Sequence, residues 1–306
     1  MMKVKFWGVR GSIPCPGPYT IKYGGNTACI ELRFVESNRL IIIDAGSGIR
    51  ELGNYMMAND LPGGPIKTEI FLTHTHWDHI MGFPFFTPSY VPGTKLKIYG
   101  PVSYEDNSLE DSVGGQLTYR YFPVRRTELA SEIEYINLKE DQFDLGDGII
   151  LTTKYLNHPL LCLGYRFEYR DKVFCTAYDT EPFQNVFCTD IDDPSYNEAM
   201  SHEGDQAARA ENQRVEKFTA GADLLIYDAQ YTQEEYESSK IGWGHSSCEY
   251  AIATAKQAGA KRLALFHHEP LRTDDQMDEL TEKYCSRDHI GDTDIFFARE
   301  GMEIEL

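Results

Sequence analysis

Short apolar runs bounded by turn-forming residues recur along the chain and predict β-strands. The runs are rich in Val, Ile, Leu, Phe and Tyr, the residue types that favour a pleated, half-buried backbone. The predicted strands are residues 3–6, 28–34, 39–43, 68–72, 95–99, 150–155, 164–169, 172–176, 222–227, 262–266 and 294–297. Strands therefore dominate the first part of the chain.

Helical periodicity is clearest in the last quarter of the chain. Ala251, Ile252, Ala255 and Ala258 fall on one face of a helix predicted for residues 247–258. A second helix is predicted for residues 274–285, which open with two aspartates as a helix N-terminus favours. Residues 195–219 are polar and charge-rich, and indicate a helix on the surface or over the functional site.

Strands early and alternating strands and helices late predict a layered α/β protein with mixed sheets. No repeat, low-complexity tract or Pro/Gly/Ser linker divides the 306 residues. We therefore expect a single domain over residues 1–306.

The charge balance bears on possible partners. Lys and Arg number 29 against 48 Asp and Glu, a formal net charge of -19. Such a surface repels polyphosphates, because affinity for nucleic acids rests mainly on neutralising phosphates. The densest basic stretch, residues 120–126, holds only three arginines. A long nucleic acid is therefore not expected as a partner.

Cysteine usage and hydropathy bear on localisation. The seven cysteines are scattered, without a Cys-x-x-Cys pair, and are expected to be buried thiols in a reducing compartment. The N-terminus has no signal-peptide pattern, and the longest apolar runs, such as residues 40–43, are too short to span a bilayer. These features predict a cytoplasmic protein without a membrane partner.

Four potential metal ligands follow the predicted strand at residues 68–72. They are His74, His76, Asp78 and His79, all within six residues. A lone histidine is more often a satisfied core residue, but four such side chains at one strand end indicate a metal site. Imidazole and carboxylate suit zinc, manganese or iron, and no thiolate is present here. A catalytic ion needs open coordination positions to hold and acidify a water molecule.

This His-x-His-x-Asp-His spacing resembles the motif of the metallo-β-lactamase superfamily. The resemblance implies three further ligands after later predicted strands: His158, Asp179 and His267. It implies two groups, one of His74, His76 and His158 and the other of Asp78, His79 and His267, with Asp179 bridging two ions. The choice of His267 over His268 rests on register with the family pattern. Taken singly, His158 and His267 could be structural, and Asp179 could cap a turn.

The same resemblance implies the architecture and the cofactors. The expected fold is the four-layer αββα sandwich, two mixed β-sheets packed face to face with helices outside. The expected cofactors are two divalent transition-metal ions, with zinc favoured over manganese or iron. Asp44 matches a position that braces the histidine loop from behind the ligands, although alone it could be an ordinary turn aspartate. A homodimer is expected from the family only.

Further segments resemble the phosphodiesterase branch of the superfamily, which includes phosphoribosyl cyclic phosphodiesterases, cyclic-nucleotide phosphodiesterases and the tRNA 3′-processing endonuclease tRNase Z. The matching segments are residues 6–14, 23–27, 224–231, 242–247 and 265–270. Asp179 stands where some β-lactamases have a cysteine ligand, and His76 stands where flavodiiron proteins have Glu. In tRNase Z a long RNA-gripping arm lies between the counterparts of His158 and Asp179, whereas here 21 positions leave room only for a strand hairpin.

Two residues in these segments imply acid catalysis. His245 lies in a Gly-His-Ser element that, in the tRNase Z-like branch, places a histidine beside the leaving oxygen, and Asp228 would support it. A histidine titrates near neutral pH and can protonate a leaving alkoxide. Alternatively, His245 could merely neighbour the cap of the helix at 247–258. Asp228 could be structural, because the family often has Glu there.

The function favoured is metal-dependent hydrolysis of a small, cyclic phosphodiester by a metal-bridging hydroxide that Asp78 orients. Arg10, Ser12 and Asn26 are candidate phosphate contacts, although Gly8 and Gly11 beside them could equally form a tight structural turn. One rival is a hydrolase of the superfamily acting on a lactone or thioester, which would not need His245. Another is a non-catalytic ligand-binding protein, although such a protein would be expected to lose at least one ligand.

Overall fold

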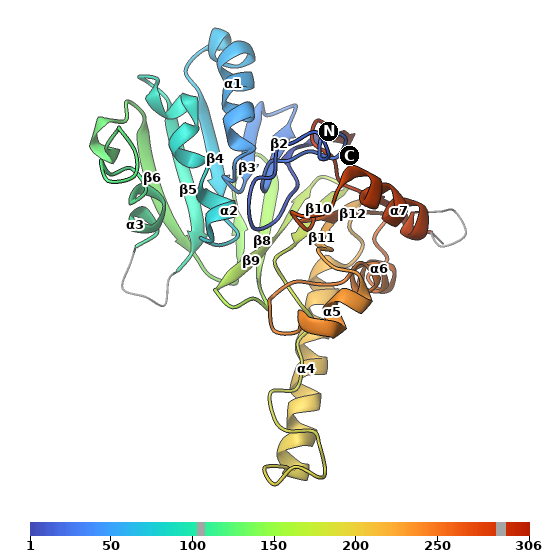
Figure 1. The fold of residues 1–306 in the computed structure, drawn as a ribbon. Coiled ribbons are helices and arrows are strands. Elements are labelled where there is room, and N and C mark those ends of the chain that lie inside the picture. The colour runs from blue at the N-terminus through green and yellow to red at the C-terminus, as the bar shows by residue number, and fades with distance from the viewer. Residues whose placement is uncertain (103–107, 286–291) are drawn as a thin grey trace.

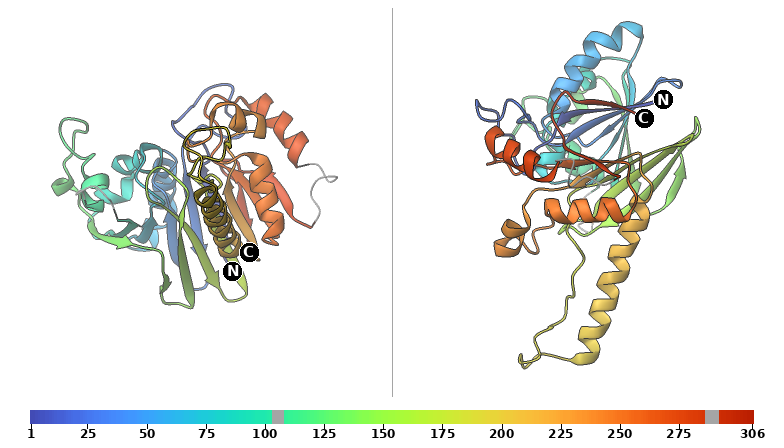
Figure 2. Two further views of the ribbon diagram at one scale, coloured as in Figure 1. Left: turned by 90° about the horizontal axis from the view of Figure 1, so that it is seen from below. Right: turned by 90° about the vertical axis from the view of Figure 1, so that its right-hand side faces the viewer.

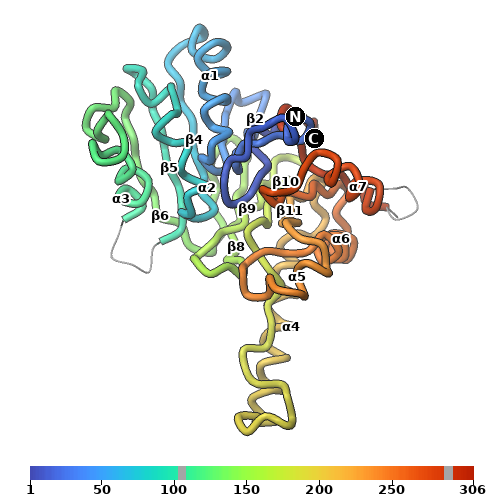
Figure 3. Tube along the Cα trace, viewed as in Figure 1, coloured from blue at the N-terminus to red at the C-terminus, as the bar shows by residue number. Residues whose placement is uncertain are grey.

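The computed structural model describes residues 1–102, 108–285 and 292–306. Two seven-stranded mixed sheets lie face to face, with helices on their outer faces (Figure 1). This arrangement confirms the predicted four-layer sandwich. The strands at both ends of the chain, β1 (Met2–Gly8) and β14 (Glu303–Glu305), pair antiparallel in the first sheet. The two termini therefore lie close together (Figure 3).

The first sheet has the strand order β14-β1-β2-β3-β4-β5-β6. Its antiparallel half ends at β3, and β3 through β6 are parallel. Besides β1 and β14, the strands are β2 (Cys29–Phe34), β3 (Arg39–Ile43), β4 (Lys67–Phe71), β5 (Lys95–Pro101) and β6 (Glu132–Leu138). The carboxyl ends of β3 and β4 therefore lie at the same edge of the sheet.

The second sheet has the order β13-β12-β11-β10-β9-β8-β7. Its β7–β10 part is antiparallel and its β10–β13 part is parallel. The strands are β7 (Gln142–Asp144), β8 (Ile149–Leu156), β9 (Cys162–Tyr169), β10 (Lys172–Ala177), β11 (Leu224–Asp228), β12 (Arg262–Phe266) and β13 (Asp294–Phe297). The parallel strands β10, β11 and β12 thus also present their carboxyl ends at one edge.

An aromatic layer joins the two sheets. Phe71 of β4 is fully buried, stacks on Tyr99 of β5, and meets Tyr165 and Phe167 of β9 edge-on across the interface. Such rings bury large apolar areas and prefer offset or edge-to-face geometry. The hydroxyl of Tyr165 also donates to the carbonyl oxygen of Leu72, 2.5 Å away, at the end of β4. This layer fixes the position of the loop that follows β4.

Helices cover both outer faces. Apolar residues of α1 (Ile49–Asn59), α2 (Trp77–Ile80) and α3 (Leu109–Gly114) pack on the first sheet. The second sheet is covered by α6 (Cys248–Gln257), α7 (Asp274–Tyr284) and the C-terminal end of α4 (Glu198–Thr219). The remaining helix, α5 (Gln233–Ser239), lies beside α6. Four short 3₁₀ turns complete the described structure: Leu61–Gly63, Phe83–Phe85, Thr87–Tyr90 and Arg126–Glu128.

The 22-residue helix α4 projects from the body of the molecule, as two views show (Figures 1 and 2). At about 1.5 Å per residue it is about 33 Å long. A returning segment accompanies it: the Asn185 amide donates to the carbonyl oxygen of Ser201 and to Asp205. The sequence prediction of a surface helix over residues 195–219 is confirmed, with Asn197 as its N-cap.

Candidate metal centre

The predicted ligands gather where the two sheets meet. His74 and His76 follow β4, and Asp78 and His79 lie in α2. In the second sheet, His158, Asp179 and His267 come shortly after β8, β10 and β12. The carboxyl ends of parallel strands share an edge, so residues distant in sequence converge there. The structure thus brings all seven predicted ligands together.

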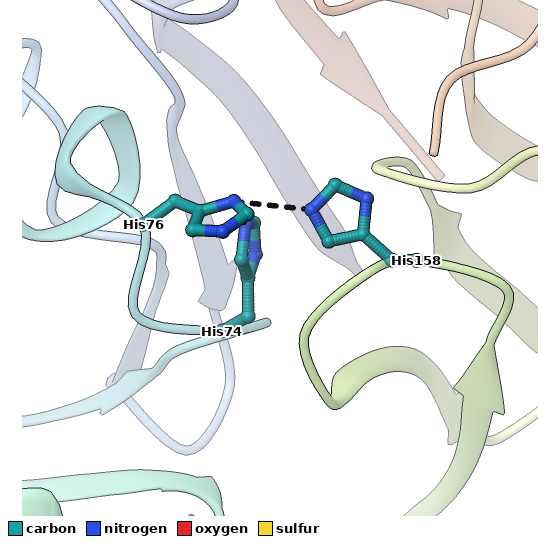
Figure 4. Close-up of side chains that lie close together, drawn as sticks. All are labelled: His74, His76 and His158. Carbon is teal, nitrogen blue, oxygen red and sulfur yellow. Dashed lines mark hydrogen bonds between the residues drawn. The ribbon is translucent and has the colours of Figure 1, made fainter. Parts of the chain in front are cut away.

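Three histidines form the first group (Figure 4). Nδ1 of His76 lies 2.8 Å from Nε2 of His74 and 3.1 Å from Nε2 of His158. Burial lowers the pKa of all three imidazoles. The pKa of His74 lies well below its usual range, and the pKa of His158 is lowered to about 4. Neutral imidazoles facing one another offer the lone pairs that a metal ion needs.

Four buried residues form the second group: Asp78, His79, Asp179 and His267. Nε2 of His79 lies 3.3 Å from a carboxylate oxygen of each aspartate, and Nε2 of His267 does the same. The oxygen of Asp179 that faces His79 is also 3.7 Å from Nε2 of His74 in the first group. Asp179 therefore lies between the two groups.

The donor atoms suit a metal ion in two respects. Among the described residues, Nε2 of His79 and Oδ1 of Asp179 are buried without a hydrogen-bond partner, which is costly unless another species satisfies them. Ligand atoms 2.0–2.2 Å from one ion at tetrahedral angles lie about 3.3–3.6 Å apart, which matches the 3.3 Å separations in the second group. This His/Asp cluster can therefore hold divalent metal.

The neighbouring His268 points elsewhere. Its ring is buried, its Nε2 lies 2.8 Å from the carbonyl oxygen of Ala298, and burial lowers its pKa to about 3. His267, by contrast, has Nδ1 3.1 Å from the side-chain oxygen of Gln230, which leaves Nε2 free to face Asp78 and Asp179. The structure thus places His267, and not His268, in the cluster.

Asp44 supports the cluster from behind. Its carboxylate accepts hydrogen bonds from the backbone N–H of Thr73 (2.7 Å) and the hydroxyl of Tyr178 (2.7 Å), and lies 2.8 Å from Nδ1 of His79. Burial lowers the pKa of His79, but Asp179, Asp78 and Asp44 together raise it well above the usual range. Asp44 thus orients His79, as partners behind metal ligands commonly do.

Several site residues adopt left-handed backbone conformations. Asp44, Asp179 and His267 have φ values of 61°, 55° and 63°, and Ser12 has 62°. This region is uncommon for residues other than glycine and persists only where surrounding contacts hold it. The hydrogen bonds of Asp44 and Gln230 provide such contacts here. Strained backbone therefore concentrates around the cluster.

His245 and Asp228 lie together beside the cluster. Nδ1 of His245 is 2.9 Å from Oδ2 of Asp228, and its ring stacks on that of His267 at 4.8 Å between centroids. Burial lowers the pKa of His245, but the charge and hydrogen bond of Asp228 outweigh it, and the pKa rises to about 9. Asp228 also accepts from the backbone N–H groups of Asp179 and Ser246. One carboxylate therefore positions both a candidate ligand and a candidate acid.

The three candidate phosphate contacts differ in position. Ser12 is exposed and its backbone N–H donates to Asp78, 2.6 Å away, so it lies at the cluster. Arg10 lies away from the surface: its guanidinium is fully buried and donates to the carbonyl oxygens of Gly24, Glu269 and Arg272, and its role as a phosphate contact stays a prediction. Arg10 instead ties the N-terminal segment to the segment after β12.

Asn26 also bonds within the protein. Its side-chain amide donates to Glu300 and accepts from the hydroxyl of Ser47, and its role as a phosphate contact stays a prediction. Gly11 packs against His267, and a Cβ there would lie 2.3 Å from the imidazole. The segment around Gly11 therefore shapes the site through backbone packing. This agrees with the alternative that Gly8 and Gly11 form a tight structural turn.

Three residues that support the site were not identified as site residues from the sequence. Tyr178 bonds Asp44, and Gln230 bonds His267. Glu181 accepts from the backbone N–H of Gly242, 2.9 Å away, in the loop that leads to His245. The position of Tyr178 beside Asp179 was a signal. Gln230 lies in the segment 224–231 that resembles the phosphodiesterase branch, whereas Glu181 carried no signal, because its partner Gly242 is distant in sequence.

The sequence is similar to a known family and to known proteins. A family model described as Beta-lactamase superfamily domain matches residues 39–268. A ribonuclease Z of Lactococcus lactis subsp. lactis (strain IL1403) is 29% identical over 296 residues, which cover 87% of this chain and 88% of that protein. A ribonuclease Z of Thermococcus sibiricus is 25% identical, with 100% of this chain and 99% of that protein covered.

Solved structures share the fold at low sequence identity. The metallo-beta-lactamase fold protein YhfI from Bacillus subtilis superposes with a TM-score of 0.63 at 20% identity, covering 99% of this chain and 98% of that chain. The short form of human tRNase Z gives a TM-score of 0.60 at 21% identity, with the same coverage. A diphosphatase of the PhnP family gives a TM-score of 0.63 at 16% identity, covering 100% of this chain and 98% of that chain.

Within the described residues, no helix is both long and apolar enough to cross a membrane.

Gly244 provides a test of the geometry around His158. Gly242 and Gly244 both have positive φ, but a Cβ on Gly244 would lie 2.4 Å from Nδ1 of His158, whereas one on Gly242 meets nothing within 4 Å. Both alanine variants should lose about 1–2 kcal/mol of stability to backbone strain in denaturant unfolding. Only Gly244→Ala should also displace His158 and lower the bound metal measured by elemental mass spectrometry. Equal metal content in the two variants would contradict this geometry.

Proposed function

This chain belongs to the beta-lactamase superfamily, and from that premise we propose that it hydrolyses a small, cyclic phosphodiester. The observation that carries the proposal is the His245–Asp228 pair, 2.9 Å apart, beside the seven-residue cluster. A held imidazolium is useful where a poor leaving group such as an alkoxide must be protonated. A lactone or thioester hydrolase would have less need of it.

The proposed cofactors are two divalent ions, with zinc favoured over manganese or iron. His74, His76 and His158 would hold one and Asp78, His79 and His267 the other, with Asp179 between them. When bound, such ions acidify water and neutralise phosphate oxygens. That the nucleophile is a hydroxide bridging the two ions stays a prediction.

Side chains of this chain would orient the attacking water, protonate the leaving group and contact the phosphate. Asp78 is held by the backbone N–H of Ser12, and we assign it the task of orienting the attacking water. His245 would donate its proton to the departing oxygen while Asp228 stabilises the imidazolium. The exposed Ser12 remains a candidate phosphate contact at this side of the site.

Precursor tRNA is the rival substrate, because relatives that align over most of the chain are named ribonuclease Z. Two observations favour a smaller substrate. The connection from His158 to Asp179 is only the β9–β10 hairpin. The projecting segment at residues 181–219, which follows Asp179, holds nine acidic residues against three basic ones. An acidic projection repels a polyanion instead of gripping it.

Two further expectations remain proposals. We place the protein in the cytoplasm because its seven cysteines are all unpaired thiols, as is usual in a reducing compartment. A homodimer remains an expectation from the family resemblance.

The substrate proposal is tested with a panel of compounds. Purified protein should hydrolyse a cyclic mononucleotide, a cyclic dinucleotide or a cyclic ribose phosphate, with only a weak effect of salt on the rate. Precursor tRNA should be cut poorly, and lactones and thioesters should not be turned over. Efficient trimming of precursor tRNA without turnover of any cyclic phosphodiester would overturn the proposal.

The metal proposal predicts about two transition-metal ions per chain. Asp179→Ala should lose most of both, because the carboxylate lies between the two groups, whereas His158→Ala should lose about one. Elemental mass spectrometry on protein purified without chelator measures this. Full activity after exhaustive chelation, with no metal detected, would refute the proposal.

The role of His245 predicts a dependence on the leaving group. His245→Ala should lower turnover of alkyl phosphodiesters by about 10²–10⁴-fold with metal content unchanged. The loss should be much smaller for a p-nitrophenyl ester, whose leaving group needs little protonation. Because the pKa of His245 is raised to about 9, wild-type activity should fall as the pH rises through that region.

A variant of the partner residue serves as the control. Asp228→Asn removes the charge that raises the pKa of His245, so the alkaline decline should shift toward lower pH. Equal losses on activated and alkyl esters in His245→Ala would indicate a structural role instead.

A further inference from the structure

The loop of residues 240–244 leads from α5 to the candidate proton donor, and much of it faces solvent. Two of its apolar side chains, Ile241 and Trp243, are 53% and 56% exposed. Gly242 and Gly244 have φ values of 83° and 81°. Glycine adopts such conformations without steric cost, but it also has the most conformational freedom to lose on folding. The loop therefore needs contacts from other segments to keep one conformation.

Glu181 provides such a contact. Its carboxylate accepts a hydrogen bond from the backbone N–H of Gly242, 2.9 Å away. Burial raises the pKa of Glu181, although hydrogen bonds from the backbone of Gly242 and Gly244 partly offset this effect. The hydroxyl of Tyr236 in α5 also donates to the carboxylate (3.3 Å), and the backbone N–H of Glu181 donates to the carbonyl oxygen of Asn157 (3.0 Å). Glu181 is therefore held at both its backbone and its carboxylate.

The loop in turn contacts two groups of the candidate centre. The carbonyl oxygen of Gly244 accepts from Nδ1 of His158 (3.0 Å), which leaves Nε2 of that imidazole to face the other histidines. His245 follows Gly244 directly, and its ring centroid lies 5.4 Å from that of His158. Asp228 contacts Nδ1 of His245 and accepts from the backbone N–H of Ser246. Asp228 thus fixes the side chain and the following residue, and the loop fixes the backbone that precedes His245.

We propose that Glu181 is a positioning residue for the proton donor. By accepting the N–H of Gly242 it holds the 240–244 loop, and the loop places His245 at the departing oxygen. The inference rests on the proposed phosphodiesterase function and adds a residue that acts through the loop instead of on the substrate. The reach of the side chain and its acceptor oxygen matter more than its charge, because the N–H that it binds is neutral.

Three variants separate hydrogen bonding from charge. Glu181→Gln keeps the length and an acceptor oxygen, Glu181→Asp keeps the charge but is one methylene shorter, and Glu181→Ala loses both. Hydrogen–deuterium exchange of peptides that cover residues 240–247 should be about fivefold faster in the Ala and Asp variants, as expected for one lost hydrogen bond. Exchange in Glu181→Gln should remain close to wild type. This measurement does not depend on turnover, and Glu181→Asp replaces Glu181→Ala if the latter does not fold.

Turnover then tests whether the loop acts through His245. Glu181→Ala and Glu181→Asp should lower kcat for a cyclic mononucleotide, whose leaving group is an alkoxide, about tenfold, because small misplacements of a reacting group slow catalysis. The loss should be much smaller for bis(p-nitrophenyl) phosphate, whose leaving group needs little protonation. In a His245→Ala background, Glu181→Ala should cause little further loss, since its effect passes through the imidazole.

Glu128→Ala is the matched control. Glu128 likewise accepts from a backbone N–H, that of Arg125 (2.7 Å), and from a tyrosine hydroxyl, that of Tyr119 (3.1 Å). It lies in the 3₁₀ turn before β6, in the part of the chain that belongs to the other sheet. Its replacement should change neither the exchange of residues 240–247 nor turnover.

The outcomes separate the two proposals. Unchanged loop exchange in Glu181→Ala, or a Glu181→Gln variant that exchanges as fast as Glu181→Ala, would overturn the role of Glu181. Faster exchange with equal losses on both substrates would also overturn it, because the loop would then not act through the proton donor. If the wild-type protein hydrolyses no phosphodiester, the proposed function is refuted and the role of Glu181 toward His245 falls with it. The exchange data would still show whether the carboxylate holds the loop.

Discussion

The carboxylate of Asp44 joins the two sheets at the point where the candidate site is built. It accepts hydrogen bonds from Thr73, after β4 of the first sheet, and from Tyr178, after β10 of the second, and it also contacts His79. A fully buried carboxylate is costly unless each oxygen is satisfied. The residues around it are consequently restricted to one arrangement. That arrangement directs His79 and Asp179, the neighbour of Tyr178, toward each other.

Asp228 has the corresponding role within the second sheet. Its oxygens accept the backbone N–H groups of Asp179 and Ser246 and contact His245. The position of the candidate proton donor is therefore set by the same carboxylate that positions a candidate ligand. Changes that move β11 relative to β10 would disturb both functions together. The coupling explains why a charged residue is tolerated at the fully buried end of a strand.

Much of the fold could be predicted from the sequence, because buried strands require apolar runs. The strands missed were β6, which is partly exposed at a sheet edge, and the three-residue strands β7 and β14. Helix α1 was also missed, although Ile49, Leu52 and Met56 have helical spacing, and Gly48 before it offers no side-chain cap. Short or weakly buried elements are determined by their neighbours more than by their own pattern.

The sequence by itself determined the chemistry of the site, because ligand types, their clustering after strands and their order along the chain are all local features. The tertiary structure alone decided which polar residues serve that chemistry. Arg10, a candidate phosphate contact, is turned inward, because three backbone carbonyl oxygens from distant segments converge on its guanidinium. Glu181, inconspicuous in the sequence, accepts from the backbone N–H of Gly242 in the loop that leads to His245. Such assignments depend on which groups meet in space, and only the packing of the two sheets determines that.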